Sequence, residues 1–141
     1  MRLRTAAAVI LTVLPVLCCC TEPADRTMTF VKSGDAADGE YVFTLPMTDS
    51  LGVWDLWLYT RVDGRPVRNL PLSMLWESPE GDVSLEVAYM DECGREGRRM
   101  LYKKDFTPAV PGEWKLKICP LGSVPGLRGM GLISEKRDGT R

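Results

Sequence analysis

Apolar side chains recur at every second position through most of this chain, and that alternation limits the fold more than any other feature. Between residues 53 and 62 the even positions are largely apolar, namely Trp54, Leu56, Leu58 and Val62. The odd positions alternate with them and include Asp55, Trp57, Tyr59 and Arg61. Because side chains i and i+2 of a strand lie on the same face, this pattern predicts a strand whose even positions face the core.

Segments of the same kind follow one another to the end of the chain. We expect about eight strands, over residues 27–32, 41–46, 53–62, 70–77, 83–89, 99–106, 114–119 and 127–136. Pro79-Glu80-Gly81-Asp82 provides turn residues between two of these segments, which predicts a hairpin. No helical period extends over eleven residues after Cys20. The sequence therefore predicts an all-β fold, an antiparallel β-sandwich of jelly-roll or immunoglobulin-like type, with a barrel as the alternative.

The first twenty residues have the organisation of a secretory signal peptide. Arg2 and Arg4 precede a largely apolar stretch over residues 6–17, which is shorter than the roughly 20 residues of a membrane-spanning helix. Leu17 lies three positions before Cys20, a spacing that resembles the bacterial lipobox. That resemblance implies cleavage before Cys20 and acylation of Cys20. It divides the chain into a signal peptide (1–19), a lipidated N-terminus and tether (20–26) and a single domain (27–141).

Two neighbouring cysteines compete with Cys20 as the lipidation site. Cys18 would place Pro15 three positions upstream, and Cys19 would place Val16 there, and both fit the lipobox less well than Leu17. An ordinary signal peptide with incidental cysteines is the remaining alternative. Each buried acyl methylene contributes roughly 0.8 kcal/mol, so two or more acyl chains would hold the domain stably at a bilayer.

The residue content excludes several classes of function. The chain has no histidine, which removes histidine-assisted hydrolases and histidine-bearing zinc sites. Loss of the signal peptide leaves 16 basic and 19 acidic residues, a net charge of -3, and no basic tail that would favour nucleic acid. Asp35, Asp38 and Glu40 lie close in sequence but lack the spacing of a calcium loop. We therefore expect no metal, no cofactor and no nucleic-acid partner.

Outward-facing carboxylates and aromatic residues are the remaining candidates for a site. Asp55, Glu77 and Glu86 would form a glycosidase pair only if two of them converged in a cleft, and we expect them to be solvated on separate strands. The expectation is therefore that the protein is not an enzyme. Trp57 and Tyr59 project from the face opposite Trp54, where they are candidates for stacking on sugar rings. Cover by a neighbouring strand or loop is the alternative.

Cys93 and Cys119 are the cysteines that lie beyond the lipobox. A bridge between them would close a loop of about 26 residues and stabilise the fold by roughly 3 kcal/mol. Cys93 falls in a predicted loop and Cys119 at a predicted strand end, so their proximity depends on the fold. The sequence leaves a disulfide and two free thiols as alternatives. Gly126, Gly129 and Gly131, near the last strand, predict a bulge or a close approach of the backbone.

Several features spread over the chain are shared with one known family. They comprise the lipobox, the short strand 41–46, the strand ending in Arg61, Asn69-Leu70, the turn with Pro79 and Gly81, the segment 111–116, and the glycine-bearing segment 121–133. Together these features resemble the gliding-motility lipoprotein family GldH of the Bacteroidetes. The sequence departs from the family at Cys93, at Cys119 and around residues 64–68.

The resemblance implies a non-catalytic outer-membrane lipoprotein associated with gliding motility or type IX secretion. Such a protein would act as a scaffold that binds other envelope proteins, whose identity the sequence does not give. Both leaflets of the outer membrane stay open as its location. The alternative hypothesis is a surface carbohydrate-binding module that uses Trp57 and Tyr59.

Overall fold

The computed structural model describes residues 26–49, 51–95 and 98–137. The predicted signal peptide, Cys20 and the tether as far as residue 25 lie outside these residues. Within the described part of the chain, no helix is long and apolar enough to cross a membrane.

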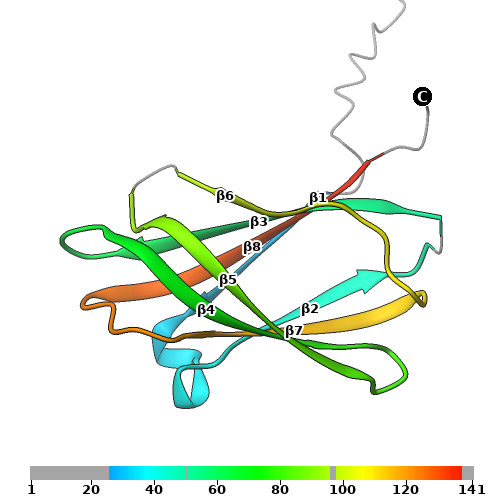
Figure 1. Cartoon of the computed structure of the whole chain (residues 1–141), viewed down its shortest axis with the longest axis horizontal. Coiled ribbons are helices and arrows are strands. Elements are labelled where there is room, and N and C mark those ends of the chain that lie inside the picture. The colour runs from blue at the N-terminus through cyan, green and yellow to red at the C-terminus, as the bar shows by residue number, and fades with distance from the viewer. Residues whose placement is uncertain (1–25, 50, 96–97, 138–141) are drawn as a thin grey trace, which may run out of the picture.

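Eight antiparallel strands form two sheets of four strands each. Sheet A has the order β1 (Arg26–Lys32), β8 (Leu127–Arg137), β3 (Val53–Val62) and β6 (Met100–Phe106). Sheet B has the order β2 (Tyr41–Met47), β7 (Gly112–Pro120), β4 (Val67–Glu77) and β5 (Val83–Cys93). Two short 3-10 turns, η1 (Ser33–Asp35) and η2 (Ala37–Gly39), connect β1 to β2. Figure 1 shows the sheets as the two layers of a sandwich, which confirms the predicted fold class and excludes the barrel.

The strand order is that of a jelly roll. β1 lies beside β8, β2 beside β7, β3 beside β6 and β4 beside β5. The chain is therefore one long hairpin, closed by the turn between β4 and β5, whose paired halves alternate between the two sheets. Jelly rolls are double-sheet folds of eight strands with this arrangement.

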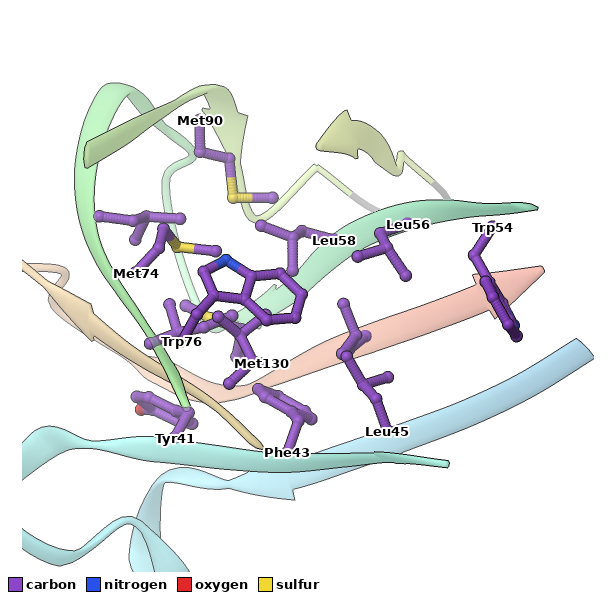
Figure 2. Packing of buried hydrophobic residues seen from close by; sticks show 14 of the residues in the cluster. Tyr41, Phe43, Leu45, Trp54, Leu56, Leu58, Met74, Trp76, Met90 and Met130 are labelled. Carbon is purple, nitrogen blue, oxygen red and sulfur yellow. The ribbon is translucent and has the colours of Figure 1, made fainter. Parts of the chain in front are cut away.

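The core fills the space between the two sheets. Trp54, Leu56 and Leu58 of β3 are buried as predicted, with Leu56 and Leu58 fully inaccessible, while Val62 is only partly buried against the core. From sheet B, alternate residues of β2, β4 and β7 face them. Figure 2 shows the centre of this cluster, where Trp76 lies among Phe43, Leu58, Met74, Met90 and Met130. Burial of each such side chain contributes about 1.5–3 kcal/mol, so the sandwich derives its stability chiefly from this layer.

One strand presents the face opposite to the one its pattern predicts. The apolar positions of β5, Val83, Leu85, Val87 and Tyr89, are between 52% and 67% exposed. The reason is the register with β4, in which Leu85 pairs with Leu75 on the outer face and Ala88 pairs with buried Leu72. The turn that closes the hairpin fixes this register, because the Ser78 amide donates to Asp82 over 2.8 Å and the Gly81 amide donates to Ser78 over 3.0 Å.

Candidate functional site

The outer face of sheet A, turned away from sheet B, is hollowed by an open groove of about 1380 Å³. Its lining comes from β1, β3 and β8, from the loops at their ends, and from Gly94, Arg98 and Arg99 between β5 and β6. Two aromatic residues, Phe30 and Tyr59, lie in it. Six basic residues also line it, namely Arg26, Lys32, Arg61, Arg98, Arg99 and Arg128. The same groove contains two acids, Asp35 and Asp63.

Two glycines of β8 make room for the aromatic rings of the groove. Gly131 pairs with Phe30 on one side and with Tyr59 on the other. A side chain at Gly131 would overlap the ring of Tyr59, and one at Gly129 would overlap the ring of Phe30. Both rings therefore lie against the backbone of β8, with their centroids 5.9 Å apart and their planes within 21°. The predicted close approach at Gly129 and Gly131 is confirmed as contact between aromatic rings and the strand.

Trp57 and Tyr59 lie on the same outer face, and both are partly exposed, but their surroundings differ. The Arg99 guanidinium covers the Trp57 ring at 4.6 Å from its centroid. The Trp57 Nε1 atom is buried and has no hydrogen-bond partner in the described part of the chain. Trp57 does not line the groove, whereas Tyr59 does. Tyr59 is therefore the one of the two that a molecule in the groove would contact.

The cations of the groove fall into two sets. Arg26 pairs with Glu135, Arg98 pairs with Glu92 over 2.6 Å, and Arg128 pairs with Asp63. Lys32, Arg61 and Arg99 have no carboxylate partner among the described residues. The Cζ atom of Arg61 lies over the Phe30 ring, 5.3 Å from its centroid. Of the two acids, Asp63 is neutralised by Arg128 and Asp35 has no cation partner in the described ranges. Three unpaired cations against one unpaired acid therefore leave the groove with a net positive charge, on a chain whose net charge is -1.

A polar network joins the two sheets at the opposite, open edge of the sandwich. The Tyr102 hydroxyl of β6 donates to Glu86 of β5, and the Trp76 indole donates to the Tyr102 hydroxyl over 2.9 Å. Lys103 Nζ lies 3.1 Å from Glu86 Oε1. Burial raises the pKa of Glu86, but the hydrogen bonds from Tyr102 and Lys103 and the charge of Lys103 outweigh burial, so that the net pKa lies below its ordinary value. Burial, followed by the bond to Glu86, raises the pKa of Tyr102.

The three carboxylates considered as a glycosidase pair lie in different places. Asp55, on the outer face of sheet A, accepts from the Asp105 amide over 2.9 Å and pairs with Arg137. Glu77 lies on the outer face of sheet B, opposite Lys115 and Val83. Glu86 belongs to the edge network and is not simply solvated as expected. Among the described residues no cluster of acids or cysteines, Asp35 and Asp38 included, has the arrangement of a metal site.

Cys93 and Cys119 are both free thiols in this structure. Cys93 is the last residue of β5, not a loop residue as predicted, and its buried thiol donates to the Thr60 hydroxyl over 3.2 Å. Its partner on β4 is Val67, whereas Cys119 lies opposite Ser73. Six residues of a strand span about 20 Å, too far for a bridge. The disulfide that the sequence left open is therefore not formed here, and burial raises the pKa of the Cys93 thiol.

A second surface of interest is the exposed row of Val83, Leu85, Val87 and Tyr89, which we call the β5 strip. β5 is an edge strand of sheet B, with β4 on one side and no strand on the other in the described part of the chain. Leu75 and Pro71 of β4 lie opposite Leu85 and Tyr89 on the same face. The strip thus combines an apolar row with an unpaired strand edge.

Sequence reasoning identified Tyr59 but missed the groove, and it also missed the separate edge network between β5 and β6. Lys32, Arg61 and Arg99 are exposed residues of three separate segments, and only the strand order β1-β8-β3-β6 brings them to one face. Glu86 and Tyr102 likewise meet only because β5 and β6 are edge strands of different sheets. No local pattern carries that information.

Comparison of the chain with family models, with characterised proteins and with solved structures found no match in any of the three.

Proposed function

We propose that this chain is a non-catalytic lipoprotein of the outer membrane that docks to another envelope protein through the β5 strip. The partner contributes an apolar, extended segment that lies along the edge of β5 and covers Leu85 and Val87. In this mode, main-chain hydrogen bonds at a sheet edge provide affinity and the alternate side chains provide specificity. The resemblance to the gliding-motility lipoproteins supports a partner from the gliding or type IX secretion machinery.

The exposure of the β5 strip is the observation that supports docking most directly. Soluble β-sandwiches normally turn such residues inward and protect their edge strands with charge or a covering loop. Here Leu85 is 67% exposed and Tyr89 is 64% exposed, on a strand with a free edge among the described residues. In the first part of β5 the inward-facing side chains are polar or small, namely Glu86 and Ala88, whereas Met90 and Cys93 near its end are buried in the core. An apolar row placed outward at a free edge is typical of a binding surface.

The test compares copurification of partners with two variants of the full-length, envelope-anchored protein. The double variant Leu85→Ser/Val87→Ser removes the centre of the strip and leaves the core intact. Since each buried aliphatic side chain contributes about 1.5 kcal/mol or more, we expect partner affinity to fall by about a hundredfold. Leu51→Ser, at a residue 88% exposed in the loop before β3, is the matched control and should recover the same partners as the natural chain.

The readout is crosslinking in cells followed by mass spectrometry of the captured proteins. Capture of one specific partner by the natural chain and by Leu51→Ser, with loss in the double variant, would support docking through the strip. Equal capture by all three proteins would remove the β5 strip from the proposal. Failure of the natural chain to capture any envelope protein after crosslinking would contradict the scaffold function itself.

A carbohydrate-binding module is the second candidate function, and one observation favours it. The Tyr59 ring lies in a long open groove on the outer face of sheet A, held against β8 by Gly131. Trp57, the other expected platform residue, is covered by Arg99. The sugar-binding hypothesis therefore depends on Tyr59 and on the groove around it.

A further inference from the structure

We propose that the groove of sheet A binds an acidic saccharide, a sugar chain that carries carboxylate or sulfate groups. The proposal rests on the second candidate function and supplies its ligand class. It does not depend on docking through the β5 strip, which belongs to the other sheet.

Unsatisfied positive charge at the groove points to an anionic ligand. Lys32, Arg61 and Arg99 line the groove and have no carboxylate partner in the described residues, whereas Arg26, Arg98 and Arg128 are paired. Exposed cations gathered on one face repel one another and raise the local concentration of anions. Since the whole chain carries a net charge of -1, this concentration of cations is local and does not follow from composition.

The chemistry of the cations favours oxoanion groups. Two of the three unpaired cations are arginines, whose planar N–H groups match the two oxygens of a carboxylate or sulfate. Arg61 and Arg99 each lie over an aromatic ring, Phe30 and Trp57 respectively. Contact with the ring restricts each arginine side chain, while no carboxylate of the described residues accepts from its N–H groups. Less side-chain freedom is then lost when an anion binds.

The uncovered ring of Tyr59 favours a saccharide over other anionic ligands. No cation covers its ring, and its hydroxyl makes no hydrogen bond within the described part of the chain. One side of the ring rests on β8 at Gly131, and the ring belongs to the lining of the groove. The C–H groups on the face of a sugar ring are apolar and fit an aromatic ring, while its hydroxyls reach neighbouring donors. A ring at the base of a cationic groove therefore matches a sugar unit with an acidic substituent nearby.

Direct binding measurements with defined polymers test this assignment. The full-length protein in detergent is titrated with polygalacturonate, dextran sulfate, neutral dextran and polyglutamate, and binding is followed by calorimetry. We expect binding to at least one of the two acidic saccharides, with polygalacturonate reporting carboxylate and dextran sulfate reporting sulfate. Neutral dextran should not bind. Added salt should weaken the complex, since the exposed charges are screened.

Matched variants locate the binding to the groove. Arg61→Gln/Arg99→Gln removes two unpaired cations and should weaken binding by about tenfold or more. Lys115→Gln/Lys117→Gln removes the same charge from the outer face of sheet B and should leave affinity unchanged. Tyr59→Ala should weaken binding, whereas Tyr59→Phe, which keeps the ring, should retain most of it. Thermal unfolding of each variant confirms that it is folded.

Three results would overturn the assignment. The first is absence of binding to both acidic saccharides. The second is an equal loss in the two double variants, which would mean diffuse attraction without a site. The third is polyglutamate binding as tightly as the saccharides with no effect of Tyr59→Ala, which would identify an acidic polypeptide as the ligand. The variant Leu85→Ser/Val87→Ser should still bind the acidic saccharide. Loss of saccharide binding can therefore be distinguished from loss of docking through the β5 strip.

Discussion

Gly126 lies where the turn before β8 meets the turn after β3. Its carbonyl accepts from the Asp63 amide over 2.8 Å, and Asp63 in turn pairs with Arg128. Its φ of +77° belongs to the left-handed region, and an added Cβ would overlap the backbone oxygen of Asp63. Both effects oppose any larger residue at this position.

Replacement of Gly126 by alanine should therefore destabilise the fold by about 2 kcal/mol or more, because backbone strain adds to a clash that a side chain cannot relieve. Urea unfolding followed by tryptophan fluorescence measures this loss. Gly34→Ala is the control, since a Cβ there meets nothing within 4 Å, and we expect a change below about 0.5 kcal/mol. Equal stability of the two variants would mean that the turns separate without cost.

The sequence predicted that Gly126, Gly129 and Gly131 mark a bulge or a close approach, and the structure confirms the close approach at each position. It could not predict which groups approach. Phe30, Tyr59 and Asp63 are between 63 and 99 residues from the glycine that each one approaches, and no local pattern specifies the strand order that brings them together. A glycine in a strand indicates that another group approaches closely, but only the strand order determines which group that is.

The positions of the strands were predicted more completely than the identity of the face that each strand buries. All eight occur where alternation places them, and β3 has the predicted bounds Val53–Val62. In β5, however, Val83, Leu85, Val87 and Tyr89 face solvent. Alternation shows which residues share a face but not which face is inward, and here the hairpin turn and the apolar face of β4 decide it. The same register extends β5 to Cys93 and buries that residue.

The edge network between β5 and β6 makes stability depend on pH. Because the pKa of Glu86 in the folded protein is lowered from the ordinary 4.5, its contribution is fully present above pH 4.5 and is lost as pH falls through the folded value. The urea midpoint should therefore decrease on acidification below pH 4.5, and Glu86→Gln should show a smaller decrease. Measurement of the midpoint across this range provides the test.

Glu80→Gln is the control for that measurement. Glu80 is an exposed residue of the turn between β4 and β5 and has no ion pair among the described residues. The urea midpoint of Glu80→Gln should vary with pH as that of the natural chain does. If the midpoint of Glu86→Gln varies in the same way, the hydrogen bonds from Tyr102 and Lys103 do not stabilise the carboxylate of Glu86, and the network would be only a feature of packing.

The whole molecule separates its two candidate binding surfaces. The groove occupies the outer face of sheet A, and the β5 strip lies on the outer face and edge of sheet B, so one ligand does not block the other. Both described ends of the chain, Arg26 and Arg137, lie at the same end of the sandwich, where Arg26 pairs with Glu135 (Figure 1). The turn after β3 lies at the opposite end.

A lipid anchor at Cys20 would hold one end of this long axis near the bilayer. The six residues 20–25 span at most about 20 Å, so the end of the sandwich at Arg26 would stay near the bilayer. The ten residues of β3 span about 33 Å, and Arg65 in the turn beyond β3 would then be well away from the membrane. Leu51, next to the start of β3, would be close to it.

Fluorophores attached at these two sites measure that orientation. In a Cys119→Ser background, Leu51→Cys and Arg65→Cys are labelled separately, since burial and a raised pKa keep the Cys93 thiol unreactive. In vesicles whose headgroups carry a quencher, the label at position 51 should be quenched more strongly. A water-soluble quencher should affect both labels equally, because both sites are exposed. Stronger quenching at position 65 would reverse the orientation, and equal weak quenching would mean that residues 20–25 do not hold the domain at the bilayer.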